Sequence, residues 1–174
     1  VPNLVRMEVR KDNTEGLNEI TIRDLIKTAL RQRPDRIIVG EIRDGAAFDM
    51  LQAFNTGHDG SLSTGHANSP KDMLSRLESL VLMGAEIPLL SIQKQIASAI
   101  DIIVHLGRLR DRSRRVLEIT EITGFESGEI KLNPIYCFEE EGEAEGRVIG
   151  GLKKINKLEH RDKLIRAGLG GSID

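Results

Sequence analysis

The chain has 174 residues, of which 39% are hydrophobic and 30% are charged, and its net charge is −2. This composition is typical of a globular protein with a real core. Basic residues are dispersed and aromatics make up only 3%, which argues against direct binding of nucleic acid. The single Cys137 excludes an internal disulfide and a cysteine-rich metal site. This cysteine usage fits a cytosolic protein. No apolar run approaches the length of a membrane span, and no signal peptide is visible.

The first stretch predicts a strand followed by a helix. Leu4 to Val9 has strand-like composition and includes Arg6, with Arg10 directly after it. Thr21 and Asp24 have the spacing of a helix-capping box. Apolar residues then recur at helical spacing up to Arg31, and Pro34 ends the helix.

The stretch from Arg36 to Asp44 is the most informative. Three β-branched residues, 37–39, predict a short, fully buried strand of a parallel sheet. The strand ends at Gly40 and Glu41, where open α/β sheets bind their ligands. Nucleoside triphosphatases need a carboxylate there to orient the attacking water and to help hold Mg²⁺. The alternative is an ordinary glutamate in a loop.

A second strand follows at the spacing of a βαβ unit. Residues 46–56 predict a helix that Gly57 closes, and residues 61–64 predict the next strand. This order brings Glu41 and His66 to the same edge of the sheet. Taken singly, His58 and His66 are more often structural than catalytic, and their spacing does not favour zinc.

The rest of the chain predicts helices and then an antiparallel meander. Ser69 and Pro70 start a helix over 70–83, Pro88 starts another to residue 100, and residues 102–106 predict a further buried strand. Strands are expected over 116–122 and 130–138, with Gly124 and the Ser127-Gly128 pair supplying the turn between them, and together they predict the meander.

The end of the chain predicts less regular structure. Five arginines within 108–115 predict either a solvated loop tip or a contact with an acidic partner or subunit. Residues 139–146 are acidic and predict a linker, and 161–167 predict a short helix. We therefore expect one domain over 1–140, then an acidic linker and short tail over 141–174.

Three ordered motifs carry a family resemblance. They are Leu-Arg-x-x-Pro-Asp at 30–35, Ile-Ile-Val-Gly-Glu-Ile-Arg-Asp at 37–44 and Thr-Gly-His-x-Gly-x-Leu-Ser-Thr-x-His-Ala-Asn-Ser at 56–69. The sequence resembles the type II/type IV secretion and pilus-assembly ATPases, and most closely their tight-adherence (Flp) pilus branch. The resemblance implies a RecA-like P-loop NTPase core, a parallel sheet flanked by helices, with the meander appended. It also implies a homohexamer on the cytoplasmic face of the inner membrane, bound to platform proteins, that uses ATP and Mg²⁺ to assemble pilin or export protein.

The resemblance also assigns residues. Glu41 resembles the Walker B glutamate and would also hold Mg²⁺ through water, whereas Gly40 stands where other nucleotidases place an aspartate. His66 resembles the His-box residue that contacts the γ-phosphate. Arg6, Arg10 and Arg31 fall in segments where the family keeps phosphate-binding arginines.

One family feature is missing from these residues. The phosphate-binding Gly-x-x-x-x-Gly-Lys-Ser/Thr loop does not occur. The chain begins with Val1, and we expect that loop to lie upstream in a longer protein. The parent would then be an ATPase and this chain alone would be inactive. Two alternatives stay open: a non-catalytic assembly or scaffold module of the same fold, and a conjugation or DNA-transfer ATPase. The upstream sequence would separate the scaffold from the motor.

Overall fold

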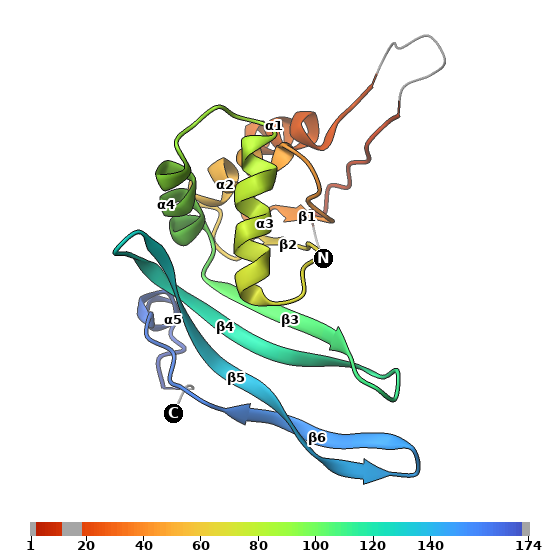
Figure 1. The fold of residues 1–174 in the computed structure, drawn as a ribbon. Helices are drawn as coiled ribbons and strands as arrows, with labels where there is room; N and C mark the ends of the chain where they lie inside the picture. Colours follow the sequence, from red (N-terminus) through yellow and green to blue (C-terminus); the bar gives the residue numbers. More distant parts are fainter. Residues whose placement is uncertain (1–2, 12–18, 172–174) are drawn as a thin grey trace. The chain divides into compact units, whose positions relative to one another are not determined.

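In a computed structural model of the chain, residues 3–11 and 19–171 are described (Figure 1). They form two compact units. The first comprises the described part of Val1–Ala67 together with Met73–Ala99, and the second comprises Asn68–Asp72 and the described part of Ile100–Asp174. Over the described ranges, no helix is both long and apolar enough to cross a membrane.

The first unit is a parallel pair of strands with helices. In chain order it contains α1 (Ile22–Arg31), β1 (Ile38–Val39), α2 (Ala46–Phe54), β2 (Leu62–Ser63), most of α3 (Pro70–Leu82) and α4 (Leu89–Ala99). Strands β1 and β2 pair in parallel with α2 between them in the sequence, which confirms the predicted βαβ unit. Helix α2 packs against α1 and α4. The core lies among these helices and includes the fully buried Leu51, Val81, Ile92 and Ile96.

Local sequence signals set the helix starts. The Thr21 hydroxyl accepts a hydrogen bond from the Asp24 amide at 3.2 Å, and the Asp24 carboxylate accepts one from the Thr21 amide at 2.9 Å. Ser69 caps α3 in the same way, because its hydroxyl accepts from the Asp72 amide at 3.0 Å. Each such cap stabilises a helix by about 1 kcal/mol. Both predicted helix starts are confirmed.

Two strand predictions in the first unit are wrong. Ile37 and Val39 are buried, but Ile38 between them is 70% exposed. Within the described residues, only one face of the sheet is therefore covered by other parts of the chain. The strand that was expected to be fully buried is half buried. Leu4 to Val9 form no strand; within 3–11 the backbone bridge is between Arg10 and Ile20. Strand-like composition yields a strand only where a neighbouring strand supplies the hydrogen bonds.

The second unit is an antiparallel meander in the order β3-β4-β5-β6. Its strands are β3 (Ile102–Arg108), β4 (Arg114–Glu126), β5 (Glu129–Ala144) and β6 (Arg147–Lys154), followed by α5 (Asp162–Arg166). Ser127 and Gly128 both have positive φ, +53° and +86°, the conformation of a two-residue hairpin turn that matches strand twist. The predicted turn is confirmed. Gly124 instead sits at a bulge inside β4.

Strand β3 differs from its prediction. It pairs antiparallel with β4 as part of the meander, and the strand expected to be buried over 102–106 is partly exposed. Val104 and Leu106 on this strand are 48% and 65% exposed. An apolar run of this length does not by itself distinguish a buried strand from an edge strand. On β5 the buried positions are Asn133 and Ile135.

The acidic stretch predicted as a linker is a strand instead. Residues 139–144 continue β5, and Glu145-Gly146 turns the chain into β6. Opposite charges explain why this segment is ordered. The Arg110 guanidinium contacts the carboxylates of Glu140 and Glu143, the latter at 2.8 Å. One arginine of the 108–115 cluster therefore finds its acidic partner within the same chain.

A buried carboxylate ties the segment after β6 to the sheet. Glu121 on β4 is only 1% exposed. It accepts hydrogen bonds from the Asn133 amide at 3.0 Å and from the backbone amides of Glu159 and His160 at 2.9 and 2.8 Å. Burial alone would raise the pKa of this carboxyl, but the three hydrogen bonds outweigh it and lower the pKa.

We expect Glu121→Gln to lower the free energy of unfolding by about 2 kcal/mol at neutral pH, because the glutamine amide would face backbone donors. Urea unfolding of the chain measures this. The exposed Glu129→Gln is the control. Since folding lowers the carboxyl pKa, the stabilisation is complete above the ordinary value of 4.5 and is lost as the pH falls through the folded value. The mutant should therefore approach the wild type at acid pH. A constant difference at all pH values would contradict this account.

Candidate functional site

The loop between β1 and α2 is held by the segment that follows β2. Ile42 is 2% exposed, and its amide donates to the Thr64 carbonyl at 3.0 Å. The Thr64 hydroxyl donates to the Gly40 carbonyl at 2.5 Å. Ile42 is buried, whereas the side chains of its neighbours Glu41 and Arg43 are 27% and 70% exposed. The backbone thus fixes which side chains this edge of the sheet presents.

Glu41 lies at the centre of a three-residue cluster. One of its carboxylate oxygens, Oε1, is 3.0 Å from Nε2 of His66, and Oε2 is 2.9 Å from a terminal nitrogen of Arg43. The side chain of Glu41 is 27% exposed, whereas those of His66 and Arg43 are 81% and 70% exposed. The structure therefore brings Glu41 and His66 together, as the βαβ order predicts. Arg43 was missed, because nothing in the sequence shows that Ile42 beside it is buried.

The base of this loop is anchored by Arg23 of α1. The guanidinium contacts the Asp49 carboxylate at 2.6 Å and donates to the carbonyls of Gly45 and Gly84 at 3.3 and 3.2 Å. The two glycines touch through their backbones, and a Cβ on Gly45 would lie 2.5 Å from the Gly84 Cα. Helix α2 therefore starts at a fixed place directly after the loop.

The other predicted site residues do not take part in the contacts that join Glu41 to His66 and Arg43. Arg6, Arg10 and Arg31 are exposed, the last in the final turn of α1. A Cβ on Gly40 would meet nothing within 4 Å, so packing in the described residues does not require glycine there. The nucleotide-binding roles of these four residues stay predictions. His58 has a structural contact instead, since its Nδ1 lies 2.9 Å from the Ala53 carbonyl.

Few side chains near Glu41 are suited to bind Mg²⁺ directly. In the described part of the chain, no cluster of three histidine, cysteine or acidic side chains is arranged to hold a metal. Glu41 offers one carboxylate, while Asp44 accepts a hydrogen bond from the Ala46 amide at 2.9 Å. Mg²⁺ in nucleotide sites is commonly held by one or two carboxylates, waters and substrate phosphates. A single carboxylate fits that kind of site, and it does not form a metal cage.

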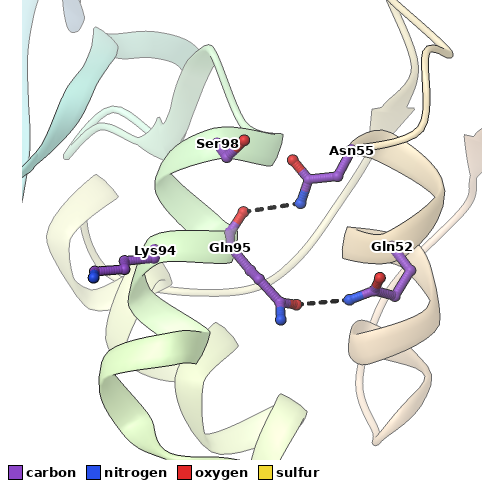
Figure 2. A pocket seen from close by; sticks show the side chains of 5 residues that line it. All are labelled: Gln52, Asn55, Lys94, Gln95 and Ser98. Atoms are coloured by element: carbon purple, nitrogen blue, oxygen red, sulfur yellow. Dashed lines mark hydrogen bonds between the residues drawn. The ribbon is translucent and has the colours of Figure 1, made fainter.

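A separate hollow lies between α2 and α4 (Figure 2). Its volume is about 350 Å³, and it is lined by Gln52, Asn55, Lys94, Gln95 and Ser98. The Gln52 amide donates to the Gln95 side-chain oxygen at 2.7 Å, and the Asn55 amide donates to the Gln95 carbonyl at 3.2 Å. These polar groups satisfy one another and link the two helices. None of the predicted site residues lines this hollow.

Comparison with known proteins finds several relatives. A putative conjugal transfer protein of Mycobacterium tuberculosis is 42% identical over 118 residues, which is 68% of this chain and 33% of that protein. The type IV secretion system protein VirB11 of Bartonella quintana is 36% identical over 127 residues, 70% of this chain and 33% of that protein. The crystal structure of the VirB11 ATPase from the Brucella suis type IV secretion system, in complex with sulphate, matches with a TM-score of 0.56. That match is 30% identical and covers 59% of this chain and 32% of the VirB11 chain.

The chain thus spans about a third of the length of these relatives. The structural likeness agrees with the predicted fold, part of a RecA-like ATPase core with an appended meander. The sequence profile of the family described as "Type II/IV secretion system protein" matches residues 3–164, nearly the whole sequence. The chain therefore belongs to the type II/IV secretion system protein family.

Proposed function

We propose that this chain is the part of a secretion motor ATPase that carries the Walker B glutamate. One observation carries the proposal: Glu41 follows β1 and contacts His66, which follows β2. Ligands of open α/β sheets bind at this end of the strands. The whole protein would couple ATP hydrolysis to protein export or pilin assembly. It would do so as a homohexamer attached to platform proteins at the cytoplasmic face of the inner membrane.

The chemistry follows from the two side chains. Phosphoryl transfer depends mainly on positioning and on electrostatic stabilisation. The Glu41 carboxylate accepts hydrogen bonds from the attacking water and orients it toward the terminal phosphate. His66, held 3.0 Å from Glu41, contacts that phosphate and reports whether it is present. Mg²⁺ bound with the nucleotide supplies charge neutralisation, and Glu41 is the residue of this chain that would hold it, through water.

A second candidate differs in what the motor serves. Several relatives carry names from conjugation, among them the probable conjugal transfer protein TrbB of Sinorhizobium fredii, which is 40% identical over 119 residues. A conjugation or DNA-transfer ATPase is therefore an alternative. The Flp pilus motor is supported only by the sequence motifs. The chemistry at Glu41 would be the same in both. A non-catalytic scaffold would not need the Glu41–His66 contact.

The first prediction concerns turnover by the full-length protein. Glu41→Gln should remove most steady-state ATP hydrolysis and leave ATP affinity within a few-fold of the wild type, because the amide cannot orient the water as the carboxylate does. The loss corresponds to several kcal/mol of barrier. Phosphate release assays measure it, with the exposed Glu86→Gln as a matched control. Hydrolysis at the wild-type rate in Glu41→Gln would contradict the assignment of Glu41 as the Walker B glutamate.

The second prediction separates a sensing role of His66 from a structural one. His66→Ala in the full-length protein should reduce the preference for ATP over ADP and leave the melting temperature unchanged, because the side chain is 81% exposed. Nucleotide titrations and thermal melts on the same mutant test both readouts. A lower melting temperature with unchanged nucleotide preference would mean that the histidine is structural.

The third prediction concerns the 174 residues by themselves. They should fold, because both units have their own core or sheet, but they should not bind Mg-ATP measurably. Triphosphate affinity in this class rests on the glycine-rich loop and its lysine, which these residues lack. Calorimetric titration of the isolated chain tests this. Micromolar binding would show that the nucleotide site is misplaced.

A further inference from the structure

Arg43 is part of the cluster around Glu41, although the family motifs assigned it no role. Its guanidinium lies 2.9 Å from the Glu41 carboxylate. The geometry is imposed by the buried Ile42, whose backbone is bonded to Thr64. The loop conformation that buries Ile42 also places Arg43 beside Glu41, so Arg43 accompanies Glu41 wherever this loop keeps its conformation.

The charge of Glu41 creates a need for such a partner. A carboxylate at the nucleotide site repels a triphosphate, and the repulsion grows as water is displaced. His66 contacts the other carboxylate oxygen, but its charge depends on protonation. An arginine guanidinium is positively charged at every relevant pH. Arg43 therefore supplies a permanent positive charge next to Glu41.

The guanidinium is also chemically suited to change partners. Its planar set of N–H donors matches phosphate as well as carboxylate. The side chain is 70% exposed, so it can reorient without breaking packing. Exposed ion pairs of this kind contribute little to stability, which means that the Arg43–Glu41 contact is not needed to hold the loop.

We propose that Arg43 is a phosphate-binding residue of this site that exchanges Glu41 for the terminal phosphate of the bound nucleotide. Without nucleotide it neutralises Glu41. When a nucleoside triphosphate binds, the guanidinium turns to the terminal phosphate, and Oε2 of Glu41 is released to accept a hydrogen bond from water. This inference rests on the proposed function, because it assigns Arg43 to the same nucleotide site.

The test is a double-mutant cycle on the full-length protein, with affinities for ADP and a non-hydrolysable ATP analogue measured by calorimetry. Arg43→Ala should weaken analogue binding about tenfold, which corresponds to about 1.4 kcal/mol, and change ADP binding less than twofold. Arg43→Lys keeps the charge without the planar donors and should lose less. The exposed Arg166→Ala is the matched control, and its affinities should equal those of the wild type. Thermal melts of every variant check folding.

The Glu41→Gln background separates two models: Arg43 moves to the phosphate, or Arg43 only neutralises Glu41. If Arg43 moves to the phosphate, removing it should weaken analogue binding at least as much in that background, because no contact to Glu41 has to be broken first. If Arg43 only neutralises Glu41, its removal should have no effect once the carboxylate is gone, and the proposal is overturned. Equal losses for the analogue and ADP would also overturn it.

Failure of this inference is distinguishable from failure of the proposed function. Arg43 variants that bind the analogue like the wild type, while Glu41→Gln stops turnover, would reject the role of Arg43 and retain the motor. A wild-type protein that binds neither nucleotide would reject both.

Discussion

The site depends on the inward position of one side chain. Ile42 is buried, and its amide continues the parallel pairing of β1 with β2 through the Thr64 carbonyl. With the loop held at that residue, Glu41 and Arg43 on either side of it stay partly exposed and in contact with each other. Thr64 supports the same arrangement from the other side by bonding the Gly40 carbonyl. His66 then follows two residues later, close enough to reach Glu41.

The sequence predicted the helix starts and the βαβ unit well, because the signals for them lie within short stretches of the chain. The capping box at Thr21, the cap at Ser69 and the βαβ spacing each depend on neighbouring residues, and each is confirmed. The contact of Glu41 with His66 follows from parallel strands ending at one edge. Arg43 escaped the prediction because its relevance depends on the burial of Ile42 in the loop after β1, and no periodicity in the sequence indicates that burial.

The errors arose where pairing over long sequence distances decides the structure. Residues 139–146 are acidic and contain two glycines, a composition typical of linkers. Residues 139–144 form a strand because Arg110 and Lys153 offset their charge and β6 supplies hydrogen bonds. Likewise, nothing near Glu121 in the sequence indicates that its carboxylate accepts hydrogen bonds from the backbone amides of residues 159 and 160. Such contacts can be identified only after the chain is folded.

The contact between Gly45 and Gly84 has a consequence for how this family can vary. A Cβ on Gly84 would lie 2.2 Å from the Gly45 carbonyl oxygen, and one on Gly45 would lie 2.5 Å from the Gly84 Cα. Neither position tolerates a side chain while the other backbone stays in place, and substituting both adds a second clash. The two glycines therefore behave as one steric unit. Any relative with a larger residue at either position has to separate the start of α2 from the end of α3, and the loop that carries Glu41 shifts with it.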